Sequence, residues 1–92
     1  MNAQVEQTLD VICKMRMLLL NGGFECDMCG VEWAAAKLAC DMAVKEVVMH
    51  GDESPLNVLD YLADKYHSYY HTNPDFEYAY LMIERIIDYL IK

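Results

Sequence analysis

Signals that start and stop helices divide this 92-residue chain into four segments. Asn21-Gly22-Gly23 follows the first segment and Gly51 follows the second, and glycine is typical of helix ends because it adopts left-handed backbone conformations without steric cost. Ser54-Pro55 and Asn73-Pro74 each place a capping residue before a proline at the first helical position. Together these signals predict helices at roughly 3–20, 28–50, 55–70 and 74–91.

Each predicted helix carries apolar side chains at steps of three and four residues, the spacing that places them on one helix face. No strand-like alternation of useful length competes with this pattern, and the short connections favour antiparallel neighbours. The sequence therefore predicts an all-α fold, a small antiparallel bundle of about four helices that forms one domain over residues 1–92. The second helix carries one row formed by Val31, Ala35, Leu38 and Met42, which Trp33, Cys40, Val44 and Val47 broaden, and the fourth has the widest stripe, with Phe76, Ala79, Tyr80, Ile83, Ile86, Ile87 and Leu90.

Acidic residues outnumber basic residues by 15 to 7, which gives a formal net charge of -8. A negative surface repels phosphate backbones and anionic lipids, so we expect no direct binding to nucleic acid or to membranes, whereas basic proteins would be attracted. The alternative is that the charge serves only solubility. The chain also lacks a secretion signal and any apolar run of about 20 residues, and these features with four reduced cysteines predict a cytoplasmic protein.

The four cysteines are the first candidates for chemistry. Cys26 and Cys29 form a C-x2-C pair, half of the pattern found in zinc knuckles, whereas a structural zinc site needs four ligands. Only Cys13 and Cys40 could complete the set, and both fall inside predicted helices. Because cysteine also packs as a small buried apolar residue, packing is favoured over a zinc site made by Cys13, Cys26, Cys29 and Cys40, and no cofactor is expected.

His67 and His71 lie one helical turn apart, and Asp64 precedes them on the same side of the predicted helix. Three such groups could hold a metal ion, although the glutamate of a metalloprotease H-E-x-x-H motif is missing. Histidines near the end of a helix are also favoured by the helix dipole, and we prefer that interpretation. No nucleophile elbow or phosphate-binding glycine loop is present, so the sequence predicts a protein that is not an enzyme.

Tyrosines are concentrated in the second half of the chain, and six of the ten aromatic residues lie between Tyr66 and Tyr80. Tyrosine joins a large apolar body to a polar tip and is common at protein interfaces, although ordinary half-buried packing would also explain these residues. On the fourth helix, a second stripe beside the core stripe is formed by Tyr78, Met82, Arg85 and Tyr89. The interface interpretation predicts a partner-binding surface made by Tyr66, Tyr69, Tyr70, Tyr78, Met82, Arg85 and Tyr89.

The leading functional hypothesis is a small acidic binding or regulatory module that engages a basic, nucleic-acid-binding protein. One version is an anti-CRISPR-like inhibitor, encoded by a phage or another mobile element, that presents negative charge where phosphate would otherwise sit. Two alternatives remain open. The chain could form a homo-oligomer such as a homodimer, which would bury surplus apolar surface against a copy of itself, or a zinc-stabilised module that uses the four cysteines.

Overall fold

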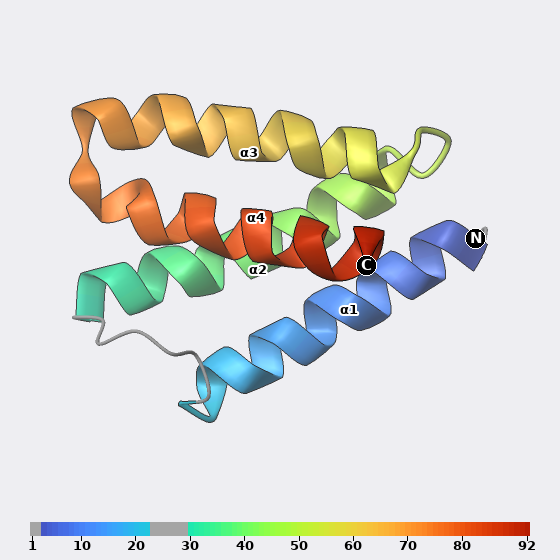
Figure 1. Ribbon diagram of the computed structural model, residues 1–92, viewed down its shortest axis with the longest axis horizontal. Helices are drawn as coiled ribbons and strands as arrows, with labels where there is room; N and C mark the ends of the chain where they lie inside the picture. Colours follow the sequence, from blue (N-terminus) through green and yellow to red (C-terminus); the bar gives the residue numbers. More distant parts are fainter. Residues whose placement is uncertain (1–2, 23–29) are drawn as a thin grey trace.

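The computed structural model describes residues 3–22 and 30–92, and these form four α-helices (Figure 1). They are α1 (Ala3–Leu20), α2 (Gly30–Met49), α3 (Pro55–Thr72) and α4 (Glu77–Ile91), with a short 3-10 turn, η1 (Pro74–Phe76), before α4. Consecutive helices run in opposite directions, and the described ranges contain no strand. The predicted all-α antiparallel bundle is therefore confirmed. None of the helices in these ranges is both long enough and apolar enough to cross a membrane.

The predicted stop after α1 and the predicted start of α3 are both present. Gly22 has a φ of 73°, a left-handed conformation that suits glycine, and its N–H donates to the Leu19 carbonyl over 3.2 Å. Pro55 begins α3, where the N–H of Val58 donates to the backbone carbonyl of Ser54 over 3.1 Å. The Ser54 hydroxyl makes no capping bond, so the proline and the extended backbone of Ser54 mark this helix start.

The fourth helix begins three residues later than the predicted start at residue 74. Asn73 does act as a cap, because its side-chain oxygen accepts a hydrogen bond from the N–H of Asp75 over 3.1 Å, but the turn that it caps is η1. The second predicted helix, 28–50, corresponds to α2, which ends one residue before the predicted end. Its described part spans Gly30–Met49, and residues 28 and 29 lie outside the described residues.

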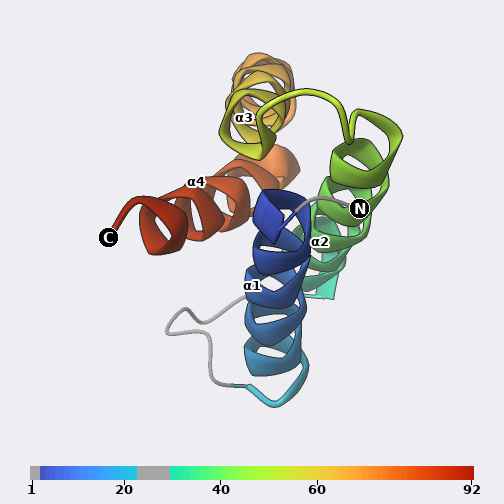
Figure 2. The same ribbon diagram turned by 90° about the vertical axis from the view of Figure 1, so that its right-hand side faces the viewer.

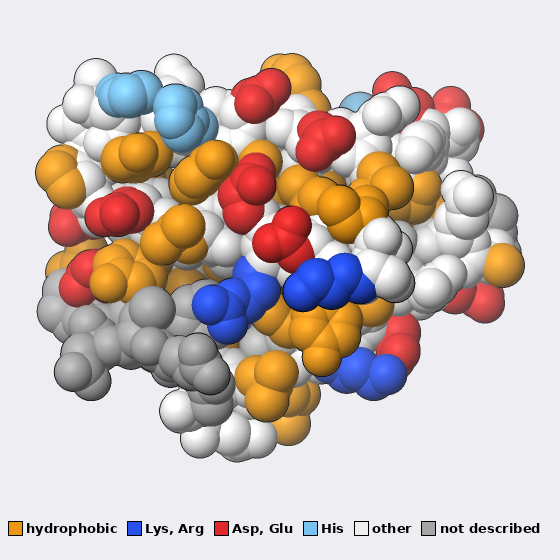
Figure 3. Space-filling view, viewed as in Figure 1, with side chains coloured by type: hydrophobic (Ala, Val, Ile, Leu, Met, Phe, Trp, Pro, Cys, Tyr) orange, Lys and Arg blue, Asp and Glu red, His pale blue; other side chains and the backbone are white. Residues whose placement is uncertain are grey.

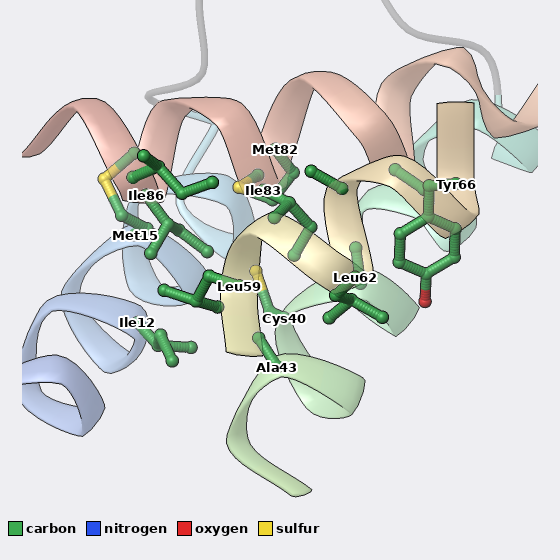
Figure 4. Close-up of a cluster of buried hydrophobic side chains, with 14 of the residues drawn as sticks. Ile12, Met15, Cys40, Ala43, Leu59, Leu62, Tyr66, Met82, Ile83 and Ile86 are labelled. Carbon is green, nitrogen blue, oxygen red and sulfur yellow. The ribbon is translucent and has the colours of Figure 1, made fainter. Parts of the chain in front are cut away.

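All four helices contribute to the buried core, and α4 packs extensively on both α2 and α3 (Figure 4). The polar side chain within it is Thr8, whose hydroxyl donates to the Gln4 carbonyl over 2.8 Å. The apolar core residues of the described chain are Val5, Ile12, Met15, Leu19, Ala36, Ala39, Cys40, Ala43, Val47, Val58, Leu59, Leu62, Ala63, Tyr66, Ala79, Met82, Ile83, Ile86 and Ile87.

The face that α2 buries differs from the row that the sequence emphasised. Val31 and Leu38 of that row are 55% and 48% exposed, whereas a neighbouring face made of Ala36, Ala39, Cys40, Ala43 and Val47 is fully buried. Small side chains allow neighbouring helices to approach closely, which explains why the alanine-rich face turns inward. As a result, α2 is apolar on both its inner and its outer side.

Candidate functional site

The predicted tyrosine surface is not a single surface in the structure. Tyr66 and Met82 are only 4% and 0% exposed and belong to the core, so the prediction that they contact a partner is wrong. Met82 is buried because α4 packs on two helices, which widens its buried sector beyond one stripe. Tyr66 stacks on Phe76 with ring centroids 6.2 Å apart, and burial, reinforced by neighbouring Tyr69, Glu46 and Cys40, raises its pKa to about 12.

The other predicted residues lie on different sides of the bundle. Tyr69 is 43% exposed on the side of α3 that faces α2, whereas Tyr70 stacks on Tyr80 of α4 with ring centroids 5.9 Å apart. Tyr89, near the end of α4, is 62% exposed, and Tyr78 and Arg85 are half-buried and exposed respectively. The most exposed tyrosine, Tyr61 at 72%, was not among the predicted contacts.

The structure separates the two described cysteines by environment. Cys13 is exposed, whereas Cys40 is fully buried beside Leu59 and Ala43 (Figure 4). Burial raises the pKa of the Cys40 thiol to about 11, with a further contribution from the charge of Asp41. This buried, apolar environment matches the packing role predicted for Cys40. The predicted partners Cys26 and Cys29 lie outside the described residues.

His67 and His71 belong to a cluster of aromatic rings near the C-terminal end of α3. The two imidazoles meet edge to face with centroids 4.6 Å apart, and His67 lies 5.1 Å from the ring of Tyr80. We call His67, Tyr70, His71 and Tyr80 the aromatic cluster. Within the described ranges, no group of three or more histidine, cysteine or acidic side chains is arranged to hold a metal ion, and this includes Asp64 with the two histidines.

Four carboxylates meet along the line between α3 and α4, and we call Asp60, Asp64, Glu84 and Asp88 the acidic seam. Each helix supplies two acidic residues at a spacing of four, which places each pair on one helix face. The charges of Asp60 and Asp64 on α3 both act on Glu84 of α4, so the acidic faces of the two helices lie on the same side of the hairpin. Acidic side chains are prominent over α3 and α4 in Figure 3.

The charges of the seam act on the pKa of Glu84. Partial burial raises the pKa of Glu84, and the negative charges of Asp88, Asp60 and Asp64 raise it further, while His67 opposes them. Ion pairs in the described ranges include Lys14–Asp10, Asp41 with Arg16 and Lys37, and His50 with Glu46 and Glu53. None of them neutralises a seam carboxylate.

Glu84→Gln is expected to stabilise the folded chain at neutral pH. Folding raises the pKa of Glu84, so the folded chain favours the protonated carboxyl. The stability that Glu84 contributes is therefore fully present below its unfolded-state pKa and is lost as the pH rises through its folded-state pKa. The gain for Glu84→Gln should therefore be up to about 1 kcal/mol at pH 7 and should vanish near pH 3. Thermal unfolding at both pH values measures it, with exposed Asp52→Asn as the control. A loss of stability at pH 7 would contradict repulsion in the seam.

Apart from Asp64 as a possible metal ligand, the acidic residues entered the sequence prediction only through their net charge, so the seam was not predicted. The usable signal is the pair of i, i+4 acidic spacings, Asp60 with Asp64 and Glu84 with Asp88, on two helices joined by a short turn. Two like-charged faces on one antiparallel hairpin must either diverge or meet, and here they meet.

The sequence matches no protein-family model, and comparisons with curated proteins and with solved structures find no match.

Proposed function

We propose that this chain is an acidic binding module that engages a basic partner protein through the acidic seam. The observation that carries the proposal is the placement of carboxylates from two helices around Glu84, whose pKa is raised by burial and then by the charges of Asp88, Asp60 and Asp64. A cationic side chain placed between them would replace this repulsion with attraction. The net charge of -8 adds long-range steering toward basic surfaces.

The aromatic cluster adds a second type of contact beside the seam. Tyr80 lies between the two sites. Burial raises its pKa, and the charges of Glu84 and Asp64 in the seam and of Tyr70 in the aromatic cluster raise it further. An arginine guanidinium can stack on an aromatic ring while it donates hydrogen bonds to a carboxylate. Arginine-rich surfaces, which are typical of proteins that bind nucleic acids, therefore suit this combination best.

A regulatory form of this function is competition with nucleic acid. Within each helix, the two seam carboxylates are separated by one turn, about 6 Å along the axis, so the seam presents two short rows of negative charge. A basic groove that normally accepts phosphates would accept such rows, and the bound module would then exclude the nucleic acid. An inhibitor encoded by a phage or another mobile element, including one of the anti-CRISPR type, would act in this way.

The test compares two variants with the same change in net charge. Asp64→Asn/Glu84→Gln alters the seam, and Glu6→Gln/Asp52→Asn alters exposed carboxylates elsewhere. Each protein is titrated against a panel of purified basic nucleic-acid-binding proteins, and labelled DNA is then offered to every complex that forms. We expect wild type to bind at least one panel member, the seam variant to bind it about tenfold more weakly, and the control to bind it nearly as well as wild type.

Salt dependence and DNA competition complete the test. Between about 50 mM and 500 mM NaCl, screening should weaken binding of the wild type strongly, and each complex should bind the labelled DNA more weakly than the free basic protein does. Equal losses in the two double variants would assign binding to net charge alone and would contradict a role for the seam. Affinity that is indifferent to salt would overturn the electrostatic basis of the proposal.

A further inference from the structure

A groove runs between α2 and α3, on the opposite side of α3 from the acidic seam. It consists of three adjoining hollows, of which the first two share Leu38 and Phe76 and the last two share Lys65. We call this feature the α2–α3 groove. Figure 2 views the bundle along α3 and shows α4 and α2 below it on different sides, so a ligand in the groove would not cover the seam.

The central part of the groove is apolar and exposed. Val31 and Leu38 from α2 line it with 55% and 48% of their surfaces open, and Tyr69 from α3 is 43% open. Met42 continues the same row of α2. The side chains from α2 are exposed because that helix turns its alanine-rich face toward the core. Apolar side chains grouped along a groove are typical of sites that bind another protein.

We propose that the α2–α3 groove binds an amphipathic helix of a partner protein, with its apolar stripe against α2 and basic residues near its two ends. Val31, Ala35, Leu38 and Met42 follow the i, i+4, i+7, i+11 spacing of a helix face, about 16 Å long. A helix with the complementary stripe can pack its ridge of side chains against this row. The small side chains of Ala34 and Ala35 permit a close approach.

The charges along the groove select a basic helix. Asp75 lies at one end, and Glu46 and Glu53 lie at the other. His50 lies between these two glutamates, with nitrogen–oxygen distances of 3.4 Å and 3.1 Å, so one imidazole faces two carboxylates. Lys65 is near the middle. A helix with lysine or arginine at both ends and none at its centre therefore has the complementary pattern.

The same charges disfavour a second copy of this chain as the occupant. Each copy carries a net charge of -8, and the ends of the groove are themselves acidic, so a dimer through this face would bring like charges together. The described ranges also offer no strand edge for an extended peptide to join, because they contain only helices. A basic amphipathic helix is complementary both to the shape of the α2–α3 groove and to the charges at its ends.

The probe is a fluorescent synthetic peptide of about 18 residues, with a leucine stripe at helical spacing and lysines near both ends. We expect saturable binding to the full chain, measured by fluorescence anisotropy, and increased helical circular dichroism on mixing. Leu38→Glu should weaken binding at least about tenfold, which corresponds to about 1.4 kcal/mol. Leu18→Glu is the matched control, because Leu18 is 46% exposed on α1 and should leave the affinity within about twofold of wild type.

Two control peptides and the seam variant distinguish binding in the α2–α3 groove from binding to the acidic seam. A peptide with the same composition but a scrambled stripe, and one with glutamates in place of the lysines, should both bind at least about tenfold more weakly. Asp64→Asn/Glu84→Gln should leave peptide binding unchanged. Binding that is lost in this seam variant but kept in Leu38→Glu would place the peptide on the seam and overturn the inference. It would also be overturned if wild type sediments as a dimer that Leu38→Glu dissociates, or if the peptide shows no saturable binding.

Discussion

Ile83→Ala is expected to lower the free energy of unfolding by about 3–4 kcal/mol, because it removes buried carbon atoms and leaves a cavity that neighbouring helices fill only in part. Ile83 is fully buried in α4, the helix that packs on both α2 and α3, and it points toward the cluster that contains Leu59 and Leu62 (Figure 4). A chain of this length has a total stability of about 5–14 kcal/mol, so the loss is a large part of it. Urea unfolding followed by circular dichroism measures the change.

The matched control is Ile91→Ala, the same substitution on the same helix at a site that is 64% exposed. We expect it to change the free energy of unfolding by less than about 0.5 kcal/mol. The comparison keeps the residue types and the helix constant and sets a buried position in the middle of α4 against an exposed one at its end. If the two variants lost equal stability, the buried face of α4 would differ from the one described, and the seam built on its other side would be misplaced as well.

The fourth helix was the most predictable from the sequence because its apolar residues occupy one broad side. Ala79, Ile83, Ile86 and Ile87 of the predicted stripe are buried, and the remaining members, Phe76, Tyr80 and Leu90, are partly buried. Its start was less predictable. A cap followed by proline begins either an α-helix or a 3-10 turn, and the choice depends on how η1 packs against α2 and α3, which local sequence does not specify.

The second helix shows where the helical period stops being informative. Its apolar residues surround the helix, so their spacing alone does not identify the buried face. The deciding factor is size, because the alanines at 36, 39 and 43 allow the neighbouring helices to come close, and larger residues such as Val31 and Leu38 are left outside. The same size difference that turned the alanines inward produced the α2–α3 groove.

The candidate sites could not be predicted residue by residue because both depend on which helices become neighbours. The seam joins residues about 24 positions apart, such as Asp60 and Glu84, and the groove joins Leu38 to Tyr69. The tyrosine-rich segment from 66 to 80 was a local pattern, and the structure divides it among the core, the groove and the aromatic cluster. Helix α3 thus separates a charged surface from an apolar one.

Ala43→Leu is expected to lower the free energy of unfolding by about 2–3 kcal/mol, although leucine forms helices nearly as well as alanine. Ala43 is fully buried on α2 between Cys40 and Val47, and Figure 4 shows it beside Cys40 in the core. Three additional carbon atoms at this position would force side chains out of their preferred rotamers or move α2 away from its neighbours. Urea unfolding measures the loss.

Ala34→Leu is the matched control, because Ala34 is exposed on the same helix and lines the groove. We expect a change within about 0.5 kcal/mol, since the added side chain finds open space. If Ala43→Leu were neutral, the inner face of α2 would not be closely packed, and the size argument for which face turns inward would fail. The exposure of Val31 and Leu38 would then need another cause. A large loss at Ala43 with none at Ala34 supports close packing as the reason that the apolar row of α2 remains available to a partner.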